Sequence, residues 1–401
     1  MTEALPKKTK KELLYKMLHA KTEGRFTEQD FLDLVGIEGD DAVTFDDLRS
    51  NILQIYDMNE TSLLTESNPM EGSLAWLNRK KQKARRQKFF SRIRHGKRTK
   101  DYKTVVAEGD SWFCFPLYVK DINEWLIDDE NINLYSIAAA GDWLTNIIYE
   151  GKYVEELSLI EPDAFLISGG GNDFCGSNRL AFMVNTNVDE EKTGDDFIKV
   201  CISNAFEAFM WTLQTQYWIL LSSLSRAEKL KDLKVITQGY DYVIPFPKVR
   251  RGPDVIQWVI NKSTDTGDWL RTPLMLKGLR KIENHIAVTA YFIDKVNEMF
   301  IKLATYKDSS GEYKFPNLYH VDCRGVAGGF EGWFDEIHLK SHKFEIVATA
   351  YKHIIFQTGL GKEPFDAKQK VVKAVWFDPE GSGPPAGQEK QLSPEQANRI
   401  R

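Results

Sequence analysis

Short apolar runs alternate with long segments of helical periodicity from residue 104 to about residue 360. This alternation is typical of repeated βαβ units, in which helices join parallel strands. Because the crossovers between parallel strands are right-handed, helices are placed on both faces of the sheet. The pattern therefore predicts an α/β protein, a three-layer α/β/α sandwich on a five-stranded parallel sheet. The predicted strands are residues 104–108, 133–140, 164–169, 233–240 and 317–322, and the predicted helices lie at about 116–130, 143–160, 195–230, 279–307 and 339–359.

The segments on either side of this core differ from it in composition. Residues 1–76 predict a small helical N-terminal region, and residues 77–103 connect it to the α/β domain at residues 104–360. Residues 361–401 are rich in Gly, Pro and Gln and predict a C-terminal tail. Within the α/β domain, a long connection at 245–278 follows the fourth strand, where folds of this kind build substrate pockets.

The connecting segment, residues 77–103, is a dense run of Lys and Arg interrupted by Phe89, Phe90 and Ile93. We interpret it as a basic connector helix. Its cations either form a solvated helix face or contact anionic lipid, nucleic acid or an acidic partner. The net charge of −5 at pH 7 disfavours a nucleic-acid binder. The partner that we consider is an anionic membrane surface, bound through residues 79–100.

No stretch of the chain has the uninterrupted apolar run of a secretory signal or of a membrane span. We therefore expect a cytoplasmic protein whose contact with any membrane is peripheral. The four cysteines show no CxxC spacing and are too few for a disulfide scaffold in 401 residues. The sequence accordingly predicts no metal site.

Polar residues follow four of the predicted strands at the carboxyl end, where open α/β sheets bind their ligands. Ser111 in "GDSW" follows the first strand, Gly141 in "AGDW" the second and Asn172 in "GGND" the third. Asp335 and His338 in "DEIH" follow the fifth. These residue types are the ones required for attack of a serine hydroxyl on an acyl carbon.

Each of these residues can supply one part of that reaction. The Ser111 hydroxyl needs a base near neutral pH, which the imidazole of His338 provides. The carboxylate of Asp335, three residues earlier, can orient this ring and offset its positive charge. The tetrahedral intermediate is anionic at oxygen, and the backbone N–H groups of Ser111 and Gly141 with the amide of Asn172 are candidate donors to it.

The four motifs resemble, in order, those of the SGNH (GDSL-type) hydrolase superfamily, and the resemblance covers residues 104–350. It implies a flavodoxin-like sheet with strand order 2-1-3-4-5, a serine esterase mechanism and neither cofactor nor metal. No GxSxG elbow is present, which disfavours the ordinary α/β-hydrolase fold. The roles implied by the resemblance are nucleophile for Ser111, oxyanion donors for Gly141 and Asn172, and the rest of the triad for Asp335 and His338.

Further residues are candidates for the pocket around these motifs. Trp112 stands where the family usually has Leu and alters the pocket wall. Trp143, Tyr240 and Asp241 are candidate lining residues, with buried packing as the alternative for Tyr240. His342, four residues after His338, is the alternative base.

The sequence therefore predicts a serine hydrolase that cleaves carboxylic esters through an acyl-enzyme. The basic run and the aromatic residues near the site favour lipid or phospholipid esters at an anionic surface. Acetylated carbohydrates, small esters and thioesters are the alternative substrates. A hypothesis of another class is a catalytically inert interaction protein that uses its basic arm. The joint presence of Ser, Asn, Asp and His at the motif positions argues against it.

Overall fold

The computed structural model describes most of the α/β domain and much of the helical region that precedes it. The predicted tail at 361–401 lies outside the described residues, as does most of the connection at 245–278. The described residues are 8–18, 24–44, 46–48, 71–95, 102–116, 118–245, 269–357 and 360.

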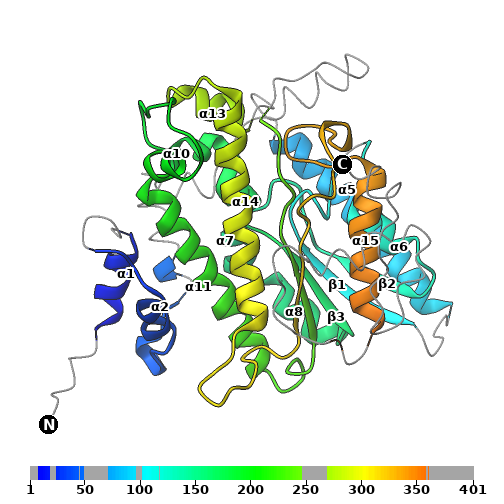
Figure 1. Ribbon diagram of the computed structural model, residues 1–401. Helices are drawn as coiled ribbons and strands as arrows, with labels where there is room; N and C mark the ends of the chain where they lie inside the picture. The colour runs from blue at the N-terminus through cyan, green and yellow to red at the C-terminus, as the bar shows by residue number, and fades with distance from the viewer. Residues whose placement is uncertain are drawn as a thin grey trace, which may run out of the picture.

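Five parallel strands form one sheet in the order β2-β1-β3-β4-β5 (Figure 1). The central position of β1 is seen in its register, since Val105 pairs with Leu134 of β2 and with Ala164 of β3. Most strand residues are buried, as expected for a sheet covered on both faces. The predicted fold class and strand order are confirmed. The strands are β1 (Lys103–Gly109), β2 (Ile132–Ser136), β3 (Ala164–Ser168), β4 (Lys234–Gln238) and β5 (Leu318–Val321).

Helices cover both faces of this sheet and make the two outer layers of the sandwich (Figure 1). On one face, α6 (Ile122–Ile127) and α15 (Ser341–Phe356) pack against each other and against the strands. The other face carries α7 (Leu144–Glu150), α8 (Lys152–Ile160), α11 (Asn204–Arg226) and α14 (Ile282–Thr305).

Two predicted helices are divided in the structure. The helix expected at 143–160 is interrupted at Gly151, whose φ of +62° ends α7 before α8 begins. The helix expected at 195–230 is split into α10 (Gly194–Cys201) and α11, because Ile202 leaves the helix to form a bridge with Val184. The remaining short elements of this region are α9 (Gly171–Cys175), the 3-10 helix η2 (Gly176–Met183) and α13 (Arg271–Leu276).

The N-terminal helices α1 (Lys10–Leu18) and α2 (Glu28–Val35) pack against α11. A capping box between Thr27 and Asp30 starts α2. The ring of Phe31 meets that of Trp218 edge to face, with the centroids 5.4 Å apart. This small apolar contact therefore joins the N-terminal region to the sandwich.

The basic segment forms α5 (Glu71–Arg94), which begins earlier than the sequence predicts and lies along β2 at the margin of the sheet. Its exposed face is cationic, whereas Asn78, Arg85 and Phe89 are buried against the sandwich. Neither α5 nor any other helix in the described ranges has the length and apolar character needed to cross a membrane.

Candidate active site

Gly109 and Asp110 shape the turn that follows β1. A Cβ atom at position 109 would lie 2.4 Å from the carbonyl oxygen of Ser168, so the close approach of β1 and β3 requires glycine. The buried Asp110 carboxylate accepts hydrogen bonds from the backbone N–H of Trp112 at 3.0 Å and from the hydroxyl of Tyr240. Burial raises the pKa of Asp110, and the Tyr240 hydroxyl opposes that rise. These contacts hold the turn from which the next residue projects.

Ser111, His338 and Asp335 form a continuous chain of hydrogen bonds. Oγ of Ser111 lies 2.7 Å from Nε2 of His338. Nδ1 of the same ring lies 2.9 and 2.8 Å from the two carboxylate oxygens of Asp335. With a proton on Nδ1, Nε2 is an acceptor, so the imidazole is oriented to take the proton of the serine hydroxyl.

The turn between β5 and α15 fixes the position of this imidazole. Oδ1 of Asp335 accepts the backbone N–H groups of Ile337 at 3.0 Å and of His338 at 2.8 Å. The indole N–H of Trp112 donates to the carbonyl oxygen of Ile337 at 3.0 Å. Trp112, the residue after Ser111, thus links the turn that carries Ser111 to the turn that carries His338.

Gly141 and Asn172 lie on opposite sides of Ser111, because β2 and β3 flank β1 in the sheet. The amide of Asn172 donates one hydrogen to the carbonyl oxygen of Asp142 at 2.8 Å, which leaves its second N–H available. Within the described part of the chain, the backbone N–H groups of Ser111 and Gly141 donate to no other group. Three donors at neighbouring strand ends are thus free to bind an anionic oxygen.

Tyr240 and Asp241, at the end of β4, are buried beneath the site. The Tyr240 hydroxyl donates to Asp110 and accepts the backbone N–H of Gly171 at 3.0 Å. The Asp241 carboxylate accepts two backbone N–H groups from the loop that follows β5. Both side chains therefore link loops of the site to one another.

Trp143 and His342 are the other two residues that the sequence singles out. Trp143 is buried at the start of α7, and the guanidinium of Arg179 lies over its ring. His342 is exposed on α15, so the structure places His338, and not His342, against Ser111.

An aromatic wall surrounds the imidazole. Phe115 is one of the aromatic residues that the sequence places near the site, whereas Trp269 and Phe334 were not predicted. The rings of Phe115 and Trp269 flank His338 with centroids at 4.7 and 5.8 Å. Phe334 packs edge to face on Phe115. Trp269 belongs to the long connection after β4, and the position of that connection at a strand end was a signal that it borders the site. Nothing in the sequence indicated that the Trp269 ring contacts His338. An apolar surface therefore borders the His338 imidazole.

Acidic side chains collect behind the oxyanion donors. Burial raises the pKa of Glu108 and, together with the charge of Glu150, raises the pKa of Asp142 to about 7. Burial also raises the pKa of Asp173, which accepts the backbone N–H of Leu144 at 2.7 Å. Asp173 therefore anchors the start of α7, while Asp142 changes its charge near neutral pH.

The described ranges contain no group of three or more His, Cys, Asp or Glu side chains that could hold a metal ion. Cys114 and Cys175, each three residues beyond a predicted site residue, are buried. Burial raises their pKa values to about 11 and about 12. Both are therefore protonated, weakly nucleophilic thiols at neutral pH.

Neither a family model nor a curated protein matches the sequence. Among solved structures, an extracellular lipase from Streptomyces rimosus is 14% identical with a TM-score of 0.37, over 62% of this chain and 98% of that one. A protein described as a GDSL-like lipase from Parabacteroides merdae is 11% identical, with a TM-score of 0.33 over 64% and 96% of the two chains. The acetylxylan esterase Axe2 from Geobacillus stearothermophilus is 12% identical, with a TM-score of 0.32 over 66% and 98%. In its sheet order and in the order of its strand-end motifs, the chain itself resembles the SGNH hydrolases.

Proposed function

We propose that the protein is a serine hydrolase that cleaves carboxylic esters through an acyl-enzyme on Ser111. The observation that carries this proposal is the chain of hydrogen bonds from Ser111 to His338 and Asp335, with Oγ 2.7 Å from Nε2. The backbone N–H groups of Ser111 and Gly141, which donate to no other described residue, and the amide of Asn172 support it, because they can bind the oxyanion of a tetrahedral intermediate.

The reaction proceeds in two halves. Oγ of Ser111 attacks the carbonyl carbon, its proton passes to Nε2 of His338, and the C=O electron pair moves to the oxygen that the three donors bind. Collapse of this intermediate expels the alcohol, which takes the proton from His338 and leaves the acyl group on Oγ. Water then attacks the acyl-enzyme with His338 as base, and collapse returns that proton from His338 to Oγ of Ser111 and releases the carboxylic acid, which ionises in solvent.

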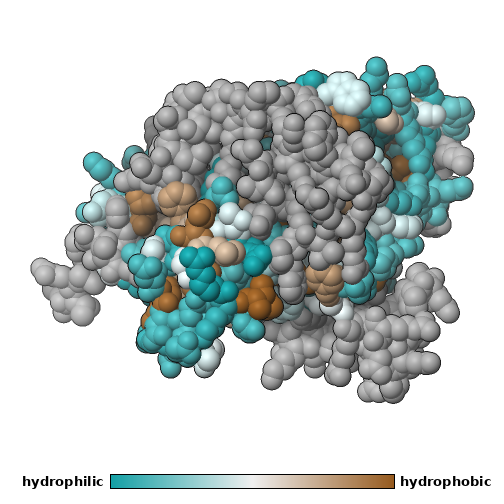
Figure 2. All heavy atoms as spheres, turned by 90° about the horizontal axis from the view of Figure 1, so that it is seen from above, coloured by the Kyte–Doolittle hydropathy of each residue, from teal (hydrophilic) through white to brown (hydrophobic). Residues whose placement is uncertain are grey.

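Apolar side chains at the rim favour an ester with an apolar acyl chain, as in a lipid or phospholipid. The segments that follow the strands expose Phe182, Leu276, Phe330 and Phe334 by 46%, 69%, 42% and 38%. Figure 2 looks down on this end of the molecule and shows brown apolar patches among the teal polar surface. Exposed apolar side chains on the segments that follow the strands suit a substrate that is largely hydrocarbon.

The outer face of α5 supports an anionic membrane surface as the place where such a substrate is met. One face of the helix carries residues spaced three, four or seven positions apart, which places them on the same side. They are Trp76, Lys80, Lys83, Phe90 and Arg94. Trp76 and Phe90 are 53% and 47% exposed. The three cations between and beside them form no ion pair with another described residue. Exposed aromatic rings next to unpaired cations are the composition that binds the interface of an anionic bilayer.

Labelling with a fluorophosphonate probe tests the catalytic proposal, because the probe reacts with activated serines. We expect the wild-type protein to be labelled and to hydrolyse a short p-nitrophenyl ester. Ser111→Ala should lose both properties, and Ser91→Ala, at an exposed serine of α5, should keep them. A folded wild-type protein that is not labelled, or a Ser111→Ala variant with the wild-type rate, would overturn the proposal.

The substrate is tested with a panel of esters on the same preparations. Faster release from long-chain phospholipid esters than from acetylated sugars or acyl thioesters is expected, and the reverse order would assign the alternative substrates. Sedimentation with phosphatidylserine vesicles, compared with phosphatidylcholine vesicles, tests the outer face of α5. We expect salt-sensitive binding to the anionic vesicles that is lost in a Lys80→Glu, Lys83→Glu double variant. Binding to single-stranded nucleic acid in place of vesicles, without probe labelling, would favour the interaction protein.

A further inference from the structure

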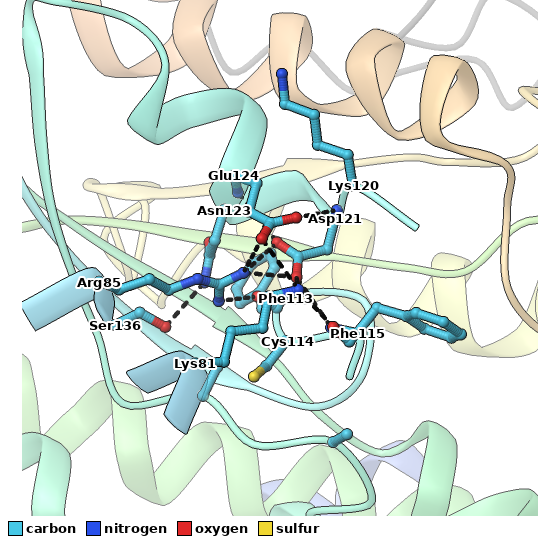
Figure 3. A network of polar contacts seen from close by, with 12 residues as sticks. Lys81, Arg85, Phe113, Cys114, Phe115, Lys120, Asp121, Asn123, Glu124 and Ser136 are labelled. Atoms are coloured by element: carbon cyan, nitrogen blue, oxygen red, sulfur yellow. Dashed lines mark hydrogen bonds and ion pairs between the residues drawn. The ribbon is translucent and has the colours of Figure 1, made fainter. Parts of the chain in front are cut away.

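The inner face of α5 bonds to the backbone of the two loops that carry the candidate nucleophile and one oxyanion donor. Figure 3 shows Lys81 and Arg85 of this helix converging on Asp121 beside Phe113 and Phe115. These contacts are made by a segment that lies outside the α/β sandwich. Through them, α5 is bonded directly to the loops that carry the candidate site residues.

The first connection reaches the loop after Ser111. Arg85 is buried, donates to the carbonyl oxygen of Phe113 at 2.7 Å and places Nη2 2.7 and 2.6 Å from the two carboxylate oxygens of Asp121. Asp121 in turn accepts the backbone N–H of Phe115 at 2.9 Å. Two backbone groups within four residues of the serine are thus held by one buried ion pair.

The second connection is made by Asn78 and reaches the loop that contains Gly141. The side-chain amide of Asn78 donates to the carbonyl oxygen of Ala140 at 3.1 Å, and its Oδ1 accepts the backbone N–H of the same residue at 3.1 Å. Asn78 is 9% exposed. The side chain of Leu74, one turn earlier on α5, lies 3.4 Å from the position that a Cβ atom on Gly141 would take.

The carbonyl of Ala140 and the N–H of Gly141 belong to one peptide plane. Because the peptide is trans, its C=O and N–H point in opposite directions. A bond that holds the Ala140 oxygen toward α5 therefore directs the Gly141 N–H away from α5. Gly141 has φ +81°, and glycine tolerates a wide range of backbone conformations, so without this bond the plane is free to rotate.

We propose that Asn78 is a positioning residue for the oxyanion hole, which it serves by locking the Ala140–Gly141 peptide with the Gly141 N–H turned toward the reacting carbonyl. This inference rests on the proposed serine hydrolase function. A donor that is misaligned by rotation of its peptide loses most of its effect on the transition state while leaving substrate binding intact. The role is therefore visible as a loss in kcat and not in KM.

The variants are Asn78→Ala and Asn78→Asp. The alanine removes both bonds to Ala140 and the acceptor of the Cys114 thiol at 3.9 Å, whereas the aspartate keeps the shape and the acceptor but removes the donor to the Ala140 carbonyl. We expect both to lower kcat for a p-nitrophenyl ester by about tenfold to a hundredfold, with KM nearly unchanged, and to slow fluorophosphonate labelling in parallel.

Gln82→Ala is the matched control, since Gln82 lies one turn further along α5. Its amide donates to the carbonyl oxygens of Ile137 and Ala138 at 3.0 Å each, so the control also loses two hydrogen bonds to the segment after β2. We expect Gln82→Ala to lower the melting temperature about as much as Asn78→Ala and to leave kcat unchanged.

Several results would overturn the inference. One is a kcat within about twofold of wild type in a folded Asn78→Ala variant. Another is a loss of kcat in Gln82→Ala equal to that in Asn78→Ala. The third is failure of both Asn78 variants to fold while Gln82→Ala folds, which would make the role of Asn78 purely structural. A wild-type protein that is neither labelled nor active would instead contradict the proposed function itself, so the two failures are distinguishable.

Discussion

The hydroxyl of Ser111 lies 2.7 Å from Nε2 of His338, although 227 positions of the chain separate the two residues. Loss of either side chain should lower kcat/KM for a p-nitrophenyl ester by several powers of ten, because the hydroxyl and its base act as one unit. The double variant Ser111→Ala, His338→Ala should be no worse than either single variant. Additive losses in the double variant would show that the two groups act separately.

Asn172→Ala should lower kcat by about a hundredfold or more, which is the usual cost of one oxyanion donor. KM should change little, because the donor acts on charge that develops after binding. Asn172 also donates to the Asp142 carbonyl at 2.8 Å, so circular dichroism of the variant should accompany the kinetics. A wild-type kcat in the folded variant would remove Asn172 from the oxyanion hole.

Trp112→Phe should keep the ring packing and lose the bond to the Ile337 carbonyl. We expect kcat to fall by about fivefold, in line with about 1 kcal/mol for one hydrogen bond. Trp125→Phe is the control, because the Trp125 indole also donates to a backbone carbonyl, that of Ser341, at 2.8 Å. Equal kinetic losses in both variants would point to general destabilisation and not to placement of His338.

Asp142→Asn should stabilise the protein at alkaline pH. Burial raises the pKa of this carboxyl to about 7 from 3.8, so the folded protein holds its proton more tightly than the unfolded chain does. Stability contributed by the neutral form is therefore lost as pH rises from about 4 through about 7, and the asparagine avoids this loss. We expect the melting temperature of the variant to exceed that of wild type at pH 8 and the difference to shrink toward pH 4. A difference that does not vary with pH would show that Asp142 does not titrate in this range.

Arg85→Ala should destabilise the protein by about 3–5 kcal/mol, because it breaks a buried ion pair and leaves Lys81 as the single described counter-charge of the buried Asp121 carboxylate. Lys88 lies on the same helix as Arg85, and Lys88→Ala removes its exposed ion pair with Asp128 at the end of α6, which should cost less than about 1 kcal/mol. Urea unfolding of the three proteins measures the difference. Similar midpoints for Arg85→Ala and Lys88→Ala would show that Lys81 alone neutralises Asp121.

The strands and the proximity of Ser111 to His338 could be predicted because their signals are local. A run such as "TVVAE" identifies a buried strand, and parallel strands end at the same edge of the sheet, so Ser111 and His338 were expected to lie together. Helix lengths were harder to predict. Gly151 and the bridge at Ile202 interrupt helices for tertiary reasons that hydrophobic periodicity does not report.

The supporting contacts of the site could not be predicted, because they join residues that nothing in the sequence relates. Asn78 bonds to Ala140 across 62 positions, and a single asparagine within a basic run has no distinctive pattern. The Trp112 indole reaches Ile337 across 225 positions. Such contacts depend on the relative placement of whole elements, which a linear pattern leaves undetermined.

The position of α5 also has a consequence for association between copies of the chain. β2 pairs with β1 on one side only, and a terminal strand of this kind ordinarily offers its unpaired backbone groups to a foreign strand. Here α5 packs along β2, Arg92 donates to the carbonyl oxygen of Ile132 within this strand, and Gln82 donates to that of Ile137 just after it. The helix thereby covers part of this edge, and we expect conditions that detach α5 to promote association of the chain through β2.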